Sequence, residues 1–227
     1  MENSVDKNKL DLHFFIIMGV LWGLAEVSLP IIIKSVCNYK ISGSVMTGIA
    51  IFFIASTYYF SNRKKIGLGI LLGIALFFKL LNVFIFNNSG INEAFLNPAF
   101  GFIIEIFAFI LIVQIIDKKF SDTFPKNMIT GALIALLAVN IFPYVSYFTP
   151  CPACLMKGTA SYPLSLYYAP ISIILSMFTF PLGSFVGEKL KNLLVSDKLV
   201  AFPVYRVIDF VSALAFLGII YINLNIK

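Results

Sequence analysis

The amino-acid sequence predicts an all-α, polytopic transmembrane helical bundle. Hydrophobic residues make up 59% of the 227-residue chain and charged residues only 12%. The mean hydropathy of +0.94 is far above that of a soluble globular domain. The apolar residues gather into stretches of roughly 20 residues, which is the length that a helix needs to cross the hydrocarbon core of a bilayer.

About seven such stretches follow one another along the chain. The first is too long for a secretory signal, contains Trp22 and Glu26 and has no A-x-A-like cleavage site, so a retained helix is expected. The later stretches are joined by short connections that leave no room for a soluble or nucleotide-binding module. We therefore expect one transmembrane domain over residues 1–227, with spans at about 12–31, 41–60, 66–86, 96–116, 127–148, 164–186 and 204–225.

Lysine and arginine are unequally distributed between alternate connections. Because cytoplasmic loops are rich in these residues, the N-terminus is predicted to be cytoplasmic and the C-terminus external. The richer set comprises Lys7, Lys9, Arg63, Lys64, Lys65, Lys118, Lys119, Lys126, Lys189, Lys191 and Lys198. The poorer set comprises Lys34, Lys40, Lys157 and Lys227.

The net charge of +6 needs no nucleic-acid partner, since loop cations that face anionic lipid account for it. The expected location is the cytoplasmic membrane of a bacterium or archaeon. Any energy from ATP would have to come from a partner subunit, because no nucleotide-binding domain fits between the spans.

A Cys-x-x-Cys pair, Cys151 and Cys154, lies in the polar interruption between the fifth and sixth stretches. Such a turn holds its sulfurs close enough to form a small-loop disulfide or to bind one soft metal ion. The predicted topology places this pair and Cys37 on the external side, where disulfides persist. We expect a redox or metal-binding pair, with a static disulfide or small buried apolar side chains as the structural alternatives.

The thioether of Met156 follows the pair closely and suits Cu(I), so Cys151, Cys154 and Met156 are candidate ligands for a soft metal. A four-ligand zinc site is not expected, because the chain's single histidine, His13, falls on the opposite side in the predicted topology.

Ionisable residues inside the spans are the second candidate site. Counting the helical rise places Glu26 and Lys79 roughly 20 Å above the cytoplasmic ends of their spans, and Glu105 roughly 14 Å below the outer surface. We therefore predict one polar cluster of Glu26, Lys79 and Glu105, which lines a ligand cavity or forms a buried ion pair that locks helix packing.

Two further features complete the predicted site. Trp22, one turn before Glu26, is a candidate to donate its indole N–H to that carboxylate or to stack on a flat ligand. Gly19 and Gly23 form a small-xxx-small pair that allows close approach of another helix, within the bundle or in a partner.

Arg206 and Asp209 do not belong to this site. Their spacing predicts a structural pair at the start of the seventh span.

Over roughly residues 12–150 the chain resembles the substrate-binding S components of energy-coupling-factor transporters. The resemblance rests on Gly19-Val-Leu-Trp22-Gly-Leu-Ala-Glu26, Gly43 to Ala50, Gly73-Ile-Ala-x-x-x-Lys79 and Asn97-Pro-Ala-x-Gly101-x-x-x-Glu105. It implies a bundle that captures a vitamin, cofactor precursor or metal species from outside. It also implies docking, through Gly19 and Gly23, onto a transmembrane coupling subunit served by ATPases.

Cys151-Pro-Ala-Cys154 is similar to the reactive pair of quinone-linked membrane thiol oxidases such as the DsbB and vitamin K epoxide reductase families. This resemblance implies disulfide exchange with an external thiol protein and electron transfer to or from a quinone. Those families relay electrons through a second cysteine pair, whereas this chain offers only Cys37.

The leading functional hypothesis is transport or ligand capture, with an outward-facing cavity lined by Trp22, Glu26, Lys79 and Glu105. An enzyme is the less favoured reading. It would be a membrane thiol–disulfide oxidoreductase in which Cys151 and Cys154 are catalytic. A third reading is a protein that handles a soft metal or haem.

Overall fold

The computed structural model describes residues 2–36, 42–61, 64–86, 95–117, 123–147 and 164–195. Almost all of these residues form α-helices and one short 3-10 helix, η3, and none of them lies in a strand. The elements are α1 (Glu2–Val36), α2 (Ser42–Phe60), α3 (Lys64–Phe86), α4 (Asn97–Asp117), α5 (Phe124–Ile141), η3 (Phe142–Tyr147) and α6 (Leu164–Val195). The prediction of an all-helical chain is confirmed for this part of the sequence.

Six described helices are long and apolar enough to cross a membrane. Their candidate spans are Leu10–Pro30, Ser42–Phe60, Lys64–Val83, Asn97–Ile116, Phe124–Tyr144 and Ala169–Leu193. These agree with the first six predicted spans to within a few residues at most ends. The seventh predicted span, 204–225, lies outside the described residues, as do Arg206 and Asp209. The number of spans and the orientation of the termini stay predictions.

Two helices extend well beyond the predicted apolar stretches. α1 begins at Glu2 rather than near residue 12, and α6 continues to Val195 rather than ending near residue 186. The added turns are polar, with residues such as Glu188 and Lys191 in α6. Hydropathy detects the apolar part of a helix, and a helix that continues past that part escapes such a prediction.

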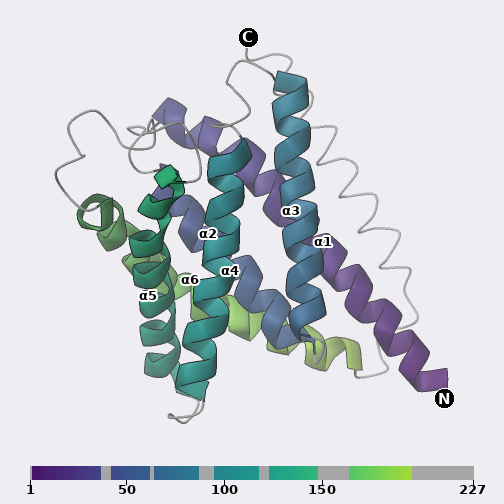
Figure 1. The fold of residues 1–227 in the computed structure, drawn as a ribbon. Coiled ribbons are helices and arrows are strands. Elements are labelled where there is room, and N and C mark those ends of the chain that lie inside the picture. Colours follow the sequence, from purple (N-terminus) through teal and green to yellow (C-terminus); the bar gives the residue numbers. More distant parts are fainter. Residues whose placement is uncertain are drawn as a thin grey trace.

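The helices pack in two groups that cross one another. In Figure 1, α3, α4 and α5 stand roughly upright in front, while α1, α2 and α6 pass obliquely behind them. α2 contacts each of the other five α-helices, and its closest association is with α6. Because α2 contains no charged residue, it can occupy this central position without burying a charge.

Glycines allow α6 to pack at backbone distance from its neighbours. A Cβ added at Gly187 would lie 2.4 Å from the carbonyl oxygen of Ser56 in α2, and one at Gly131 of α5 would lie 2.1 Å from that of Ser176 in α6. Real side chains cannot occupy such positions. Small residues are the usual means by which membrane helices approach this closely.

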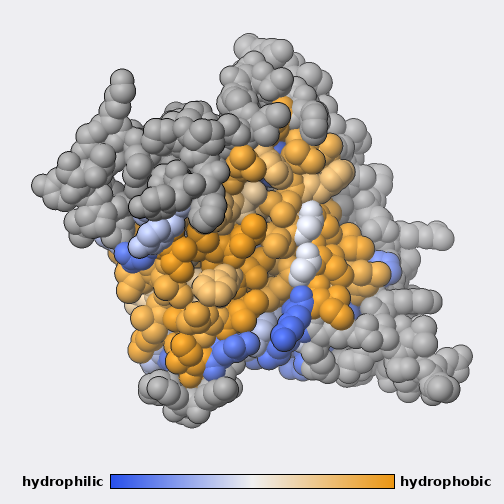
Figure 2. Space-filling model, in the orientation of Figure 1, coloured by the Kyte–Doolittle hydropathy of each residue, from blue (hydrophilic) through white to orange (hydrophobic). Residues whose placement is uncertain are grey.

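The outer surface of the described helices is apolar across its middle. Figure 2 shows this as a broad orange band, with most hydrophilic residues gathered toward the lower end. Several large side chains, including Phe77, Phe107 and Phe185, are more than half exposed, as expected for a lipid-facing surface.

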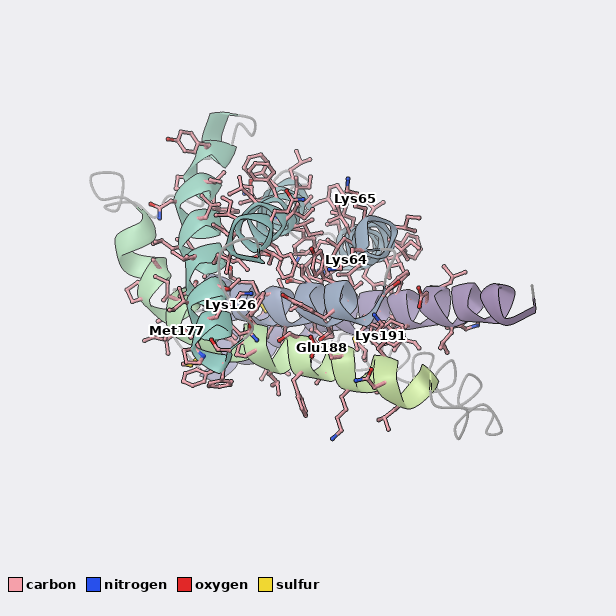
Figure 3. The ribbon with its side chains drawn as sticks, turned by 90° about the horizontal axis from the view of Figure 1, so that it is seen from below. Lys64, Lys65, Lys126, Met177, Glu188 and Lys191 are labelled. Atoms are coloured by element: carbon pink, nitrogen blue, oxygen red, sulfur yellow. The ribbon has the colours of Figure 1, made fainter. Side chains whose placement is uncertain are left out.

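Charged residues gather at the end of the bundle where the N-terminus lies. Figure 3, seen from that end, labels Lys64 and Lys65 of α3, Lys126 of α5, and Glu188 and Lys191 of α6. The labelled lysines all belong to the richer set, whose connections are predicted to be cytoplasmic. They share one end of the molecule, as the topology prediction requires, and the side of the membrane that this end faces stays a prediction.

Candidate functional site

Three of the described helices carry one charged residue in their middle, and the fold brings these three residues together. They are Glu26 in α1, Lys79 in α3 and Glu105 in α4. α2 has no charged residue, and the charges of α5 and α6 lie only in their end turns. Glu26 interacts electrostatically with both Lys79 and Glu105, so the three residues of the predicted polar cluster lie near one another.

The backbone of Glu26 is the first contact point of the site. Pro30 lies within α1, four residues after Glu26, and has no N–H to donate to the Glu26 carbonyl. The Lys79 ammonium takes that place, with Nζ 3.4 Å from the carbonyl oxygen. A carbonyl that the helix cannot satisfy thus receives a donor from the neighbouring helix α3.

The side chain of Glu26 is held by Trp22. The indole Nε1–H donates to Glu26 Oε1 over 3.3 Å, across one turn of α1. Trp22 has no exposed surface and Glu26 is 5% exposed. Donation to Glu26 is one of the roles that the sequence suggests for Trp22. The Lys79 ammonium is also near enough to the Glu26 carboxyl group to interact with it electrostatically.

Glu105 approaches the same place from α4. It is 8% exposed, and its charge interacts unfavourably with that of Glu26. The hydroxyl of Thr47 in α2 interacts with the Glu105 carboxylate and also lies 3.2 Å from the carbonyl of Gly43. With one proton to donate, Thr47 can serve either the carboxylate or the backbone.

Two residues of the site were missed from the sequence, Thr47 and Phe102. The ring of Phe102 packs on that of Trp22 with centroids 4.9 Å apart and planes tilted by 52°. Phe102 lies three residues before Glu105, a spacing that puts both on one face of α4. That spacing was the available signal for Phe102, whereas nothing in the pattern of α2 singles out Thr47.

Gly19 and Gly23 face α3 within the bundle. An added Cβ would lie 2.9 Å from Cβ of Ile74 at Gly19 and 2.7 Å from Cβ of Phe78 at Gly23. Phe78 directly precedes Lys79, so this close contact between α1 and α3 brings the ammonium within reach of Glu26. In this arrangement, a docking role for the two glycines requires α1 and α3 to separate.

The cysteine site predicted from the sequence lies outside the described residues. This applies to Cys37, Cys151, Cys154 and Met156. Among the residues that the structure does describe, no three His, Cys, Asp or Glu side chains gather into a group that could hold a metal ion. The helices that flank the cysteine pair in the sequence are η3, which ends at Tyr147, and α6, which begins at Leu164. Both of these ends lie away from the N-terminal end of the bundle (Figure 1).

The buried site combines acidic, basic, hydroxyl and aromatic groups. It presents two carboxylates, one ammonium, one hydroxyl and an aromatic pair, which can bind a small polar molecule by charge, hydrogen bonds and ring contact. The chain matches no protein-family model, no curated protein and no solved structure.

Proposed function

We propose that this chain is an integral membrane transport or ligand-capture protein, similar in role to the S components of energy-coupling-factor transporters. Its ligand is a small cofactor, vitamin or metal species, bound by Trp22, Glu26, Lys79 and Glu105. The observation that carries the proposal is the convergence of three isolated charges from three helices on one place. Charged residues within spans are costly, and they commonly mark a ligand site or a pathway.

The structural alternative is an ion cluster that only locks the helices together. A buried ion pair contributes little net stability compared with apolar packing, so stability alone is a weak reason to place three charges there. The cluster also holds two carboxyl groups for one ammonium, so it is more than a single ion pair.

Access to the site requires movement, since Trp22, Glu26 and Glu105 are almost fully buried. Pro30 favours a movement of the C-terminal part of α1 that would open the site. The missing backbone hydrogen bond makes this turn the place where the helix bends most easily. The same carbonyl is held by Lys79, so bending of α1 and rearrangement of the site would be linked. In this proposal a separate transmembrane coupling subunit with ATPases supplies the energy.

The experiment compares small molecules that remain bound to the purified protein. Wild type and the variants Glu26→Gln and Lys79→Met are purified in lipid nanodiscs, and extracted ligands are identified by mass spectrometry. Each variant should lose about tenfold or more of the retained species, as expected when a charge-assisted contact worth about 1.5–3 kcal/mol is removed. Thermal unfolding of the same samples reports whether they are folded.

The matched controls are two exposed charged residues at the N-terminal end of the bundle. Glu188→Gln and Lys65→Met make the same chemical changes at exposed positions far from the site, and they should retain the ligand. If folded Glu26→Gln and Lys79→Met retain the species as fully as the controls do, the cluster is structural and the proposal fails.

A second candidate function rests on the cysteine pair. The spacing Cys151-Pro-Ala-Cys154 favours a membrane thiol–disulfide oxidoreductase coupled to a quinone, with an external thiol protein as partner. The same residues with Met156 suit a protein that handles a soft metal or haem. In both readings the location is the cytoplasmic membrane of a bacterium or archaeon.

A further inference from the structure

One side of α3 carries two exposed glycines. Among the six candidate spans α3 has the smallest buried share, 28%. Gly69 and Gly73 are exposed, and a Cβ added at either would meet no atom of the described chain within 4 Å. Ile66 and Phe77 are 56% and 55% exposed, and their spacing from the glycines puts all four residues on one side of the helix. These four residues are called the α3 face below.

Other glycines of this part of the bundle have a packing reason to be glycine. Gly67 lies on the opposite side of α3, where an added Cβ would come within 2.7 Å of the Phe15 ring of α1. Gly19 and Gly23 of α1 meet α3 equally closely. Gly69 and Gly73 have no such contact within the described chain, although glycine forms helices less readily than alanine. Close approach of a helix from outside the bundle would explain them.

We propose that the α3 face binds a second copy of this chain, so that α3 packs on α3 of the other copy in a parallel pair. Glycines four residues apart let two membrane helices approach closely, and the large side chains of Ile66 and Phe77 border the contact. From Ile66 to Phe77 the face extends over about three helical turns. This interaction surface is separate from the proposed ligand site and does not depend on it.

The membrane itself favours a second copy as the occupant. Two copies inserted in the same orientation are related by a two-fold axis along the bilayer normal, and this axis places identical residues at the same depth. Gly69 and Gly73 of one copy therefore meet the same glycines of the other. A different helix would need small residues at matching depths.

The charges of α3 also fit this arrangement. The helix carries no charged residue between Lys65 and Lys79, so two neutral faces would meet. The ammonium of Lys64 lies 4.1 Å from the ring centre of Tyr58 in α2, and that of Lys79 reaches the Glu26 carbonyl of α1. Both therefore point into their own bundle. Lys65 is exposed at the end of the span, where its long side chain can extend to water.

The test measures association of the full chain in lipid vesicles. Donor-labelled and acceptor-labelled protein, with the dyes on a C-terminal tag, are mixed and diluted with increasing amounts of lipid. Wild-type energy transfer should fall along a monomer–dimer curve. Gly69→Leu and Gly73→Leu should each raise the dissociation constant by about tenfold or more, which corresponds to about 1.4 kcal/mol. Both variants should stay folded, because the added side chain enters open space.

Gly43→Leu is the matched control. Gly43 is also an exposed helix glycine whose added Cβ meets no described atom within 4 Å, but it belongs to α2. This variant should dimerise as wild type does.

The inference is overturned if wild type shows only the energy transfer of random crowding at every dilution. It is equally overturned if Gly69→Leu and Gly73→Leu dimerise as tightly as Gly43→Leu. A monomeric wild type whose Gly69→Leu variant loses thermal stability would assign the α3 face to another segment of the same chain, such as the predicted span 204–225. A monomeric wild type that retains a different membrane protein, lost in Gly69→Leu, would assign it to that protein.

Discussion

The ammonium of Lys79 lies 3.4 Å from the backbone carbonyl oxygen of Glu26. This is the carbonyl that Pro30, four residues later in α1, cannot satisfy. Lys79 therefore supplies the hydrogen-bond donor that α1 lacks at this carbonyl, and it also brings a positive charge to the site. The geometry thus links the Pro30 turn of α1 to the position of the Lys79 charge.

A double-mutant cycle on Lys79 and Pro30 tests this link. Lys79→Met should lower the free energy of unfolding by about 1–3 kcal/mol, because it leaves a buried carbonyl without a donor. In a Pro30→Ala background the N–H of Ala restores the helical bond to Glu26, so the same change should cost measurably less. Denaturant unfolding of the four proteins in detergent gives the coupling free energy.

A coupling energy within about 0.3–0.5 kcal/mol of zero would show that the two residues act independently. Lys65→Met, introduced in the same two backgrounds, provides the control, because Lys65 is exposed at the far end of α3. It should have the same small effect in both.

Substitution of Gly23 should disturb the site by changing the contact between α1 and α3. An added Cβ would lie 2.7 Å from Cβ of Phe78, which cannot move without shifting α3. Gly23→Ala should therefore push α1 from α3, destabilise the protein by about 1–3 kcal/mol and change the emission of Trp22. Unfolding and fluorescence measure the two effects.

Gly73→Ala is the matched control for this change. Gly73 also lies within a helix of the bundle, but an added Cβ there meets no atom within 4 Å. Alanine has the higher helix propensity, so this variant should be as stable as wild type or slightly more stable. Equal behaviour of the two variants would contradict the proposed tight contact between α1 and α3.

Much of the fold follows from the sequence because each apolar stretch of about 20 residues corresponds to one helix of known rise. That regularity also placed Glu26, Lys79 and Glu105 at compatible depths. Rotation about each helix axis was harder to predict. Between its polar ends, α4 carries only Glu105 and Gln114 as polar residues, so no apolar stripe shows which side of the helix faces Trp22.

The atom that Lys79 contacts was also missed, although the sequence contains the signal. A charge pair with the Glu26 side chain was expected, and the carbonyl became a target only through the position of Pro30. The spacing between Glu26 and Pro30 equals the hydrogen-bond spacing of an α-helix, and a proline at that position always frees the carbonyl.

Replacing Trp22 by phenylalanine separates its hydrogen bond from its packing. Trp22→Phe keeps an aromatic ring against Phe102 but removes the donor to Glu26. The buried carboxylate loses a partner, so the free energy of unfolding should fall by about 1–3 kcal/mol. Thermal and denaturant unfolding measure the change.

The comparison for Trp22→Phe is Phe102→Leu, which weakens the ring contact and leaves the hydrogen bond intact. If Glu26 depends on the indole, Trp22→Phe should impair ligand retention more than Phe102→Leu does at similar stability. The reverse order would mean that Trp22 acts mainly through packing.

Thiol trapping tests the second candidate function. If Cys151 and Cys154 exchange electrons, a membrane-impermeant maleimide should label them in intact cells only after mild reduction, and the labelled fraction should vary with the oxidant supplied. The pair is predicted to lie on the external side, so the impermeant reagent should reach it. Cys151→Ser should abolish cycling and leave Cys154 labelled without reduction. A pair that stays oxidised under all conditions, in cells whose growth and ligand uptake are unchanged by Cys151→Ser, would identify a static disulfide and leave the buried site of Glu26, Lys79 and Glu105 as the functional centre.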